Sequence, residues 1–283
     1  MGTVESLVTA VFDIACILNL AAQETGVPGY IEQDGHLAEA RPLDELTITI
    51  VHDNYPCVES LKTAWGFSAY VTGAGKRILF DTGSDGTLLL ENMAKLQIDP
   101  ANIDVVVLSH VHGDHAGGLA GLLRVNPRVC VYLPASFPAG IKDLVRGYGA
   151  PVVEVHEPEP ICPSVHSTGV LGRRIKEQAL VVRTGRGIVI LTGCAHPGIR
   201  AIVDGVHRLQ PGPILLVMGG FHLEWAMSRK VRQIIAGFRT CGVRCVAPTH
   251  CSGEKTREQF REAYGQQFIE VGVGKSINLS DLP

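Results

Sequence analysis

The densest group of reactive side chains in this sequence is the segment Ser109-His110-Val111-His112-Gly113-Asp114-His115. It places three histidines and one aspartate within six residues, in a chain of 283 residues with 11 histidines in all. Imidazole nitrogens and a carboxylate suit Zn²⁺, and Fe or Mn fit the harder, carboxylate-bearing position. Residues 110–115, called here the HVHGDH loop, therefore predict a metal site.

The spacing inside the HVHGDH loop divides its ligands between two cations. In extended backbone, residues i and i+2 project to the same side, so His110 and His112 can bind one ion, called here the first ion. Gly113 permits a sharp turn, after which Asp114 and His115 can bind a second ion close by. We therefore expect two divalent metal ions, with Zn²⁺ favoured.

An apolar run at residues 104–109 comes directly before this loop and predicts a buried strand that ends at the ligands. Loops at the carboxyl ends of strands are where α/β proteins place their sites. Ala116-Gly117-Gly118 follows with almost no side-chain bulk, so the next helix can bring its backbone close to the site.

Short apolar runs and helical patterns alternate along most of the chain. We expect strands at residues 46–52, 67–72, 76–81, 104–109, 129–133, 178–184, 187–192, 214–218 and 243–247. We expect helices near residues 85–97, 116–124, 198–209, 224–238 and 254–264. Hairpin strands followed by alternating strands and helices predict an α/β protein, a mixed sheet sandwich with helices outside.

Composition narrows the functional classes. The chain is 46% hydrophobic and 19% charged, which supports a large core and argues against disorder. Its 25 basic and 28 acidic residues give a net charge of -3, so no electrostatic footprint indicates nucleic acid or a membrane surface as a partner. Eight cysteines without a CxxC pair favour a reducing, cytoplasmic compartment. We expect a small-molecule substrate.

Residues 1–45 are interpreted as an extension that contributes no metal ligand. Apolar residues recur at helical spacing over residues 4–22 and predict an amphipathic helix, followed by an irregular linker. Asp13 interrupts the apolar stretch and no Lys or Arg precedes Arg41, so neither a membrane span nor a signal peptide is expected. The segment is expected to cover an apolar surface of its own chain or of a partner subunit in a homo-oligomer.

Several motifs make the chain similar to a known family. HVHGDH after an apolar strand, with FDTG (80–83) upstream, resembles the metallo-β-lactamase superfamily from about Leu46 to the C-terminus. Similarity to one branch, which includes dihydropterin-methyl-(ribofuranosyl)aminobenzene 5′-phosphate synthase and metal-dependent hydrolases, rests on VHDN (51–54), TGCAHPGI (192–199), GGFHL (219–223) and PTHCSG (248–253). The resemblance implies a four-layer αββα sandwich of two mixed sheets, with residues 46–283 as one catalytic domain and metals at the edge between the sheets.

Four loop residues cannot fill two coordination shells, so further ligands must come from later in the chain. His196 follows a predicted strand and is assigned to the first ion. His250 follows another and is assigned to the second ion. His222, at the end of a third strand, competes with His250 for that place and otherwise contacts the substrate.

At one position the chain departs from the superfamily pattern. Most members carry a metal-bridging Asp at the end of the strand that reads IVILTG here, where this chain has Cys194. A thiolate is a good Zn²⁺ ligand, but a small buried residue beneath the site is an equal alternative. Asp81 is expected to orient a ligand histidine, or else to form a turn. Asn54 and Ser252 are expected to contact substrate, with a turn and a helix cap as their alternatives.

Two adjacent cations lower the pKa of a shared water, so a metal-bound hydroxide is expected to attack an ester, amide or phosphoester. Asp114 and His222 are the side chains expected to assist catalysis. The helix start after Ser252 and the basic loop 173–176 favour a phosphorylated substrate. We therefore predict a binuclear metal-dependent hydrolase of a small ester. The alternatives are a transferase that joins a dihydropterin to a phosphorylated ribofuranosyl-aminobenzene, and a non-catalytic metal-binding sensor.

Overall fold

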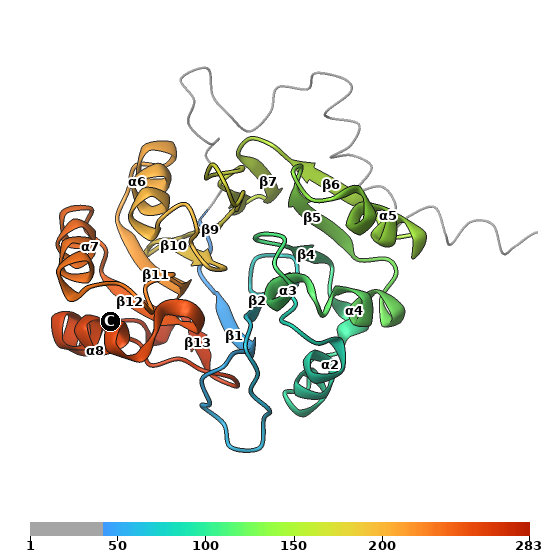
Figure 1. Cartoon of the computed structure of the whole chain (residues 1–283), viewed down its shortest axis with the longest axis horizontal. Coiled ribbons are helices and arrows are strands. Elements are labelled where there is room, and N and C mark those ends of the chain that lie inside the picture. The colour runs from blue at the N-terminus through green and yellow to red at the C-terminus, as the bar shows by residue number, and fades with distance from the viewer. Residues whose placement is uncertain (1–41) are drawn as a thin grey trace, which may run out of the picture. The chain divides into compact units, whose positions relative to one another are not determined.

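Two mixed β-sheets form the centre of the computed structural model, which describes residues 42–283 (Figure 1). The first sheet has the strand order β13-β1-β2-β3-β4-β5-β6, and β3 to β6 run parallel. Its strands are β1 (Thr47–His52), β2 (Ser68–Thr72), β3 (Ile78–Phe80), β4 (Val105–Val107), β5 (Cys130–Pro134), β6 (Val152–Val155) and β13 (Ser276–Asn278).

The second sheet has the strand order β12-β11-β10-β9-β8-β7, and β10 to β12 run parallel. Its strands are β7 (Glu159–Cys162), β8 (Val165–Ser167), β9 (Leu180–Thr184), β10 (Gly187–Thr192), β11 (Ile214–Gly220) and β12 (Cys245–Thr249). All seven residues of β11 are buried, because a parallel strand in the middle of such a sheet is covered on both faces.

Helices cover the outer face of each sheet. The first sheet is flanked by α2 (Gly86–Lys95), α4 (Leu119–Val125) and α5 (Ala139–Gly147), and the second by α6 (Ile199–Leu209), α7 (Ser228–Thr240) and α8 (Glu254–Tyr264) (Figure 1). Short helical turns complete the chain: α3 (Gly113–Ala116), η1 (Pro100–Asn102), η2 (His250–Ser252), η3 (Gly265–Gln267) and η4 (Leu279–Asp281).

Alternation along the strands divides the core into layers. Leu79 and Val106 pack with the helices of the first sheet, and Val181 and Ile190 pack with those of the second. Residues that alternate with these, such as Phe80, are fully buried on the opposite face, where one sheet packs on the other. The expected four-layer αββα sandwich is confirmed.

The nine predicted strands are confirmed as β1–β5 and β9–β12. The missed elements are β6, β7, β8, β13 and α5. Strands β7 and β8 are short, carry Pro160 and His166, and lie at one edge of the second sheet, so cross-strand pairing rather than an apolar run determines them. The predicted helix 116–124 corresponds to α3 and α4, which Gly117 and Gly118 separate.

The predicted N-terminal helix lies outside the described residues, and the extent of the extension, residues 1–45, stays a prediction. Leu43 already pairs with Thr184 at the end of β9. Among residues 42–283, no helix combines the length and the apolar character that crossing a membrane requires.

Candidate metal centre

The candidate site lies where one strand of the first sheet and three strands of the second end. The HVHGDH loop follows β4, and His112 precedes the one-turn helix α3. His196 follows β10, His222 follows β11 and His250 follows β12. The fold therefore brings together side chains from four loops that are far apart in the sequence.

The three histidines assigned to the first ion converge. His110 Nε2 lies 3.1 Å from His112 Nδ1, and that same nitrogen lies 3.2 Å from His196 Nε2. The rings of His110 and His196 are also neighbours, with centroids 4.7 Å apart. Each ring thus directs one nitrogen toward a common point.

The three residues assigned to the second ion form an adjoining group. His250 Nε2 lies 3.2 Å from His115 Nε2 and 3.3 Å from Asp114 Oδ2. Asp114 Oδ2 is 3.6 Å from His115 Nε2. The geometry places His250, and not His222, beside Asp114 and His115, as the ranking of the two histidines expected.

Asp81 orients two of these histidines from beneath the loop. Its fully buried carboxylate accepts hydrogen bonds from Ser109 N at 2.6 Å, Ser109 Oγ at 2.7 Å and His115 Nδ1 at 2.7 Å. Because Ser109 Oγ donates to Asp81, it accepts from His110 Nδ1, which is 2.9 Å away. One carboxylate therefore sets the ring orientation of a residue in each group, directly for His115 and through Ser109 for His110.

Asn54 holds the third oriented ring, that of His250. Its Nδ2 donates to the His250 carbonyl oxygen at 3.3 Å, so its Oδ1 is left to accept from His250 Nδ1 at 3.0 Å. Trp65 lies against the same imidazole with a centroid distance of 4.9 Å, and is 48% exposed. Asn54 thus contacts a candidate ligand, and its expected role as a substrate contact stays a prediction.

The hydrogen bonds of the Nδ1 atoms and the spacing of the remaining ligand atoms show whether the site can accommodate cations. His115 and His250 each donate through Nδ1, so both Nε2 atoms present lone pairs to each other across 3.2 Å. When both rings are neutral these lone pairs repel, and either a proton on one Nε2 or a metal ion between them relieves that repulsion. Ligands about 2.05 Å from a tetrahedral Zn²⁺ are about 3.3 Å from one another. The spacings of 3.1–3.6 Å found here match that arrangement, so the residues fit a divalent ion.

Cys194 lies between the two groups. Its Sγ is 3.2 Å from His115 Nε2 and 3.5 Å from His250 Nε2, and it also lies within 4.8 Å of ligand atoms of His110 and His196. The thiol is buried. This position would allow Cys194 to bridge two ions, and its role as a ligand or as a small buried residue stays a prediction.

His222 belongs to a third set of ligand atoms, with Cys194 and Cys251, all within 4.8 Å of one another. Its ring lies 4.4 Å from that of His196, and unlike the other site histidines it is exposed. Cys251 is buried beneath it, so His222 closes the open side of the site. Sequence reasoning did not select Cys251, although the residue lies within the motif PTHCSG (248–253).

The backbone at the site is unusual. Five described non-glycine residues have positive φ, and four of them lie here: Asp81 (59°), Ala195 (62°), His222 (54°) and His250 (51°). Such conformations cost roughly 1–3 kcal/mol each and persist where the surroundings impose them. They occur at strand ends, where the chain turns sharply enough to aim these side chains at the site.

Two glycines allow backbones to meet beneath the ligands. A Cβ at Gly118 would lie 2.1 Å from the Thr82 oxygen, so the close approach expected for the Ala116-Gly117-Gly118 run is confirmed. A Cβ at Gly193 would lie 2.1 Å from Ser109 Oγ. The strand end that carries Cys194 therefore packs directly on the Asp81–Ser109 pair of the other sheet.

Glu177 is a site residue that sequence reasoning missed. Its buried carboxylate accepts three backbone hydrogen bonds, from the N–H groups of Cys194 (3.0 Å), Ala195 (2.8 Å) and His196 (2.7 Å). Burial raises the pKa of Glu177 to about 7 in spite of these bonds. An acidic residue directly before an apolar strand was the only signal, and it does not reveal that this carboxylate holds the left-handed turn at 195.

The electrostatics favour the neutral form of two candidate ligands, His110 and His196, and a metal-binding imidazole must be neutral. Burial, together with the neighbouring histidines, lowers the pKa of His110 strongly and that of His196 to about 4. Burial opposes ionisation of Asp114, but the hydrogen bond to His250 and the charge of His115 outweigh it and lower its pKa. His115 differs, because the Asp81 carboxylate outweighs burial and raises its pKa.

The expected substrate contacts are less directly placed. Ser252 is fully buried, and its Oγ accepts from Phe221 N at 3.1 Å and donates to the Thr249 oxygen at 2.6 Å. Its contact with substrate stays a prediction. The basic loop 173–176 is exposed and follows Gly172, where a Cβ would lie 3.2 Å from the Pro197 ring beside His196.

Comparison with known proteins agrees with this geometry. Residues 66–205 match the model of the metallo-beta-lactamase superfamily. A 7,8-dihydropterin-6-methyl-4-(beta-D-ribofuranosyl)-aminobenzene-5'-phosphate synthase of Methanocaldococcus jannaschii is 28% identical over 250 residues, which cover 72% of this chain and 85% of the synthase.

Two solved structures show the same fold. A metal-dependent hydrolase of the beta-lactamase superfamily superposes with a TM-score of 0.69 and 27% identity, over 82% of this chain and 98% of the hydrolase. The short form of human tRNase Z superposes with a TM-score of 0.59 at 17% identity, over 84% of this chain and 99% of the other. The strand order, the ligand-bearing strand ends and these similarities lead to one conclusion: the chain belongs to the metallo-beta-lactamase superfamily.

Proposed function

We propose that this protein is a binuclear metal-dependent hydrolase that acts on a small ester, with a phosphoester as the preferred substrate. The fold implies divalent metal binding. The observation that carries the two-ion proposal is the pair of adjoining ligand groups. His110, His112 and His196 would hold the first ion, and Asp114, His115 and His250 the second, with Cys194 between them.

When bound, two such ions polarise a phosphoryl or carbonyl oxygen and lower the pKa of a shared water. The protein supplies fixed positions. His110 and His115 are fully buried and held by the Asp81–Ser109 pair, whereas the Asp114 side chain is 21% exposed. Asp114 and the exposed His222 therefore border the side from which a substrate enters, and we assign them the catalytic contacts.

His222 is suited to hold a proton at that open side. Its hydrogen bond to Cys251 outweighs burial and raises the pKa of the imidazole. A protonated imidazole beside the entry side can donate to a departing oxygen. The exposed basic side chains of the loop 173–176, near the Pro197 turn, support a phosphorylated group as the part of the substrate that lies beyond the metals.

A second candidate is a transferase that joins a dihydropterin to a phosphorylated ribofuranosyl-aminobenzene. Its support is the similarity to the synthase of Methanocaldococcus jannaschii, which extends over 85% of that enzyme. Both candidates take a small phosphorylated molecule, and neither needs nucleic acid or a membrane. The cytoplasmic location and a homo-oligomer formed through the N-terminal extension stay predictions.

The experiment that tests the proposal is a substrate panel on metal-loaded protein. We expect hydrolysis of p-nitrophenyl phosphate or of the corresponding diester, lost in Asp114→Ala and kept in His207→Ala, whose exposed side chain on α6 lies outside the site. Carboxylic esters complete the panel. Product in a pterin coupling assay, without hydrolysis of any ester, would replace the first candidate by the second. No turnover in either assay would favour the metal-binding sensor.

A further inference from the structure

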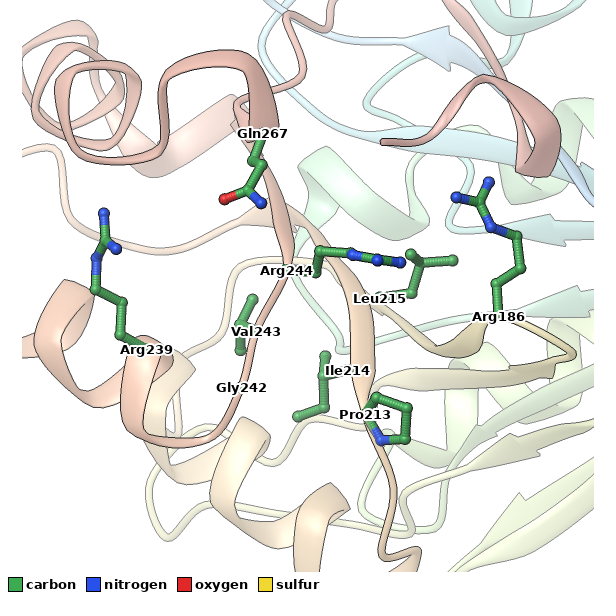
Figure 2. A pocket seen from close by; sticks show the side chains of 9 residues that line it. All are labelled: Arg186, Pro213, Ile214, Leu215, Arg239, Gly242, Val243, Arg244 and Gln267. Atoms are coloured by element: carbon green, nitrogen blue, oxygen red, sulfur yellow. The ribbon is translucent and has the colours of Figure 1, made fainter.

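A cavity with three arginines lies at the other end of the second sheet. Arg186 is in the turn between β9 and β10, Arg244 directly precedes β12, and Arg239 is in the last turn of α7 (Figure 2). These are the amino ends of the parallel strands, whereas the metal centre lies at their carboxyl ends. Seven residues of β11 separate the two regions by about 20 Å.

The arginines of this cavity are not neutralised. No acidic residue lines it, and among residues 42–283 none of the three arginines forms an ion pair with an Asp or Glu side chain. The chain as a whole has a net charge of -3, whereas this cavity is lined by three basic residues and by no acidic one.

Two of the three guanidinium groups are held in place. Arg186 donates to the carbonyl oxygens of Leu279 at 2.6 Å and Pro283 at 3.3 Å. Arg239 donates to the Ala263 oxygen and lies 5.3 Å from the centre of the Tyr264 ring. A guanidinium group has five N–H donors, so both keep donors for a ligand. Fixing a cationic side chain beforehand lowers the entropy that binding would cost.

Arg244 lies between the other two arginines. In Figure 2 its side chain runs across the cavity, with Arg239 on one side and Arg186 on the other. No hydrogen bond from its guanidinium is found among the described residues, and the side chain is exposed. Burial raises the pKa of the Cys245 thiol, and both Arg244 and Arg186 oppose that shift, so these two charges act on one point at the start of β12.

Part of the remaining wall of the cavity is apolar, beside Gly242 and the amide of Gln267. Pro213, Ile214, Leu215 and Val243 form it, and the cavity volume is about 520 Å³. Pockets for small organic ligands have volumes of about 300–1,000 Å³. The cavity therefore offers cationic donors for one end of a molecule and an apolar surface for the other.

We propose that this cavity binds a small organic phosphate with at least two negative charges, of the nucleoside diphosphate type, separately from the metal centre. Guanidinium forks match phosphate oxygens in bidentate geometry, and three of them in a cavity that no acidic residue lines favour a polyanion. The apolar wall takes the organic part. Arg239 also borders a second cavity with Glu262, so it contributes less to binding than Arg244.

The test uses metal-loaded, full-length protein and the α,β-methylene analogue of ADP, whose phosphate–phosphate bridge resists hydrolysis. Methyl NMR reports where it binds, because Ile214, Leu215 and Val243 line the cavity while Val111 and Leu223 neighbour the metal ligands in sequence. We expect saturable shifts at the three cavity methyls. Arg244→Ala should weaken that binding about tenfold or more, the effect of losing one charge-assisted contact.

The matched control is Arg232→Ala, because Arg232 lies on α7 like Arg239 but outside this cavity. It should leave the affinity unchanged. Arg244→Gln, which keeps a polar side chain, should weaken binding as Arg244→Ala does and guards against an effect of folding. Shifts confined to Val111 and Leu223, wild-type affinity in both Arg244 variants, or no shift at millimolar analogue would overturn the proposal. Because no metal ligand is altered, this outcome is independent of the hydrolase assay.

Discussion

The two halves of the metal centre are built in different ways. The first sheet supplies His110, His112, Asp114 and His115 from one loop, where the spacing of the sequence itself brings them together. The second sheet supplies Cys194, His196, His222 and His250 from three separate strand ends, where only the parallel alignment of β10, β11 and β12 does so.

Each half also has its own buried carboxylate. Asp81 holds side chains of the HVHGDH loop, whereas Glu177 holds the backbone of residues 194–196. In the HVHGDH loop the strand and α3 already define the path of the backbone, so the buried carboxylate orients the imidazole rings. After β10 the left-handed turn at Ala195 is intrinsically unfavourable, so the buried carboxylate of Glu177 stabilises the path of the backbone.

The largest expected effect comes from removing a ligand from the loop half. His110→Ala and Asp114→Ala should each reduce the metal content from about two ions per chain to about one, because each removes a ligand from a different ion. Metal analysis of protein purified without chelator measures this, with His207→Ala as the control. Full metal content together with full activity in either variant would mean that the HVHGDH loop is not the site.

The next effect concerns the carboxylate under the loop. Asp81→Asn should lower metal affinity roughly 10–100-fold, because a partner that orients ligand imidazoles contributes on that scale. An amide cannot accept all three hydrogen bonds that reach Asp81. Competition with a chromophoric chelator gives the affinities. Unchanged affinity at both ions would show that the rings are oriented by packing alone.

Cys194 tests whether the two halves share a ligand. Burial and contact with Cys251 raise the pKa of the Cys194 thiol, so it is protonated unless a cation favours the thiolate. Coordination would also shield the sulfur, so at alkaline pH thiol reagents should label Cys194 more slowly with metal bound than after chelation, and Cys194→Ser should lower zinc affinity. Buried Cys245, at the other end of the sheet, serves as the reference thiol. Equal labelling of Cys194 with and without metal would mark it as a spectator.

Glu177→Gln should have a smaller effect, confined to the strand-end half. One amide oxygen replaces two carboxylate oxygens, so at least one of the three backbone hydrogen bonds is lost. Because these bonds hold His196 in place, the affinity for the first ion should fall about tenfold. The second ion should be retained. The matched control is Lys176→Gln, because Lys176 is the exposed neighbour of Glu177, whereas Gln178 on the other side is buried. A greater loss of affinity for the second ion than for the first would mean that Glu177 acts through His250 instead of His196.

The smallest effect is expected away from both halves. The hydrogen bond from Lys142 lowers the pKa of Glu154, which Arg146 also contacts. A depressed folded-state pKa stabilises the protein above the unfolded pKa, and this contribution is lost as the pH falls through the folded pKa. Glu154→Gln should therefore cost less than about 1 kcal/mol at pH 7 and nothing in acid, since the pair is partly exposed. Urea unfolding at both pH values measures it, and a cost that grows in acid would contradict the sign.

Local sequence patterns were enough to predict the metal-binding chemistry of the loop half and the class of fold. The spacing of HVHGDH, the apolar run before it and the small residues after it are local features, and local backbone geometry translates them into ligand positions. The strand ends were also readable, because an apolar run that stops at a histidine indicates which edge of the sheet that histidine occupies. This was enough to select His196, His222 and His250.

The contacts between these residues depend on the packing of the two sheets. His115 and His250 are 135 positions apart, and their contact depends on how the two sheets pack on one another. The same packing places Cys194 between the two ligand groups. It also brings Glu177 to the turn at Ala195 and Asn54 to the ring of His250, where each forms a hydrogen bond. A periodic pattern reports which face of an element is buried, but not which residue of another element lies opposite. That is a property of register and layer packing, which no local pattern contains.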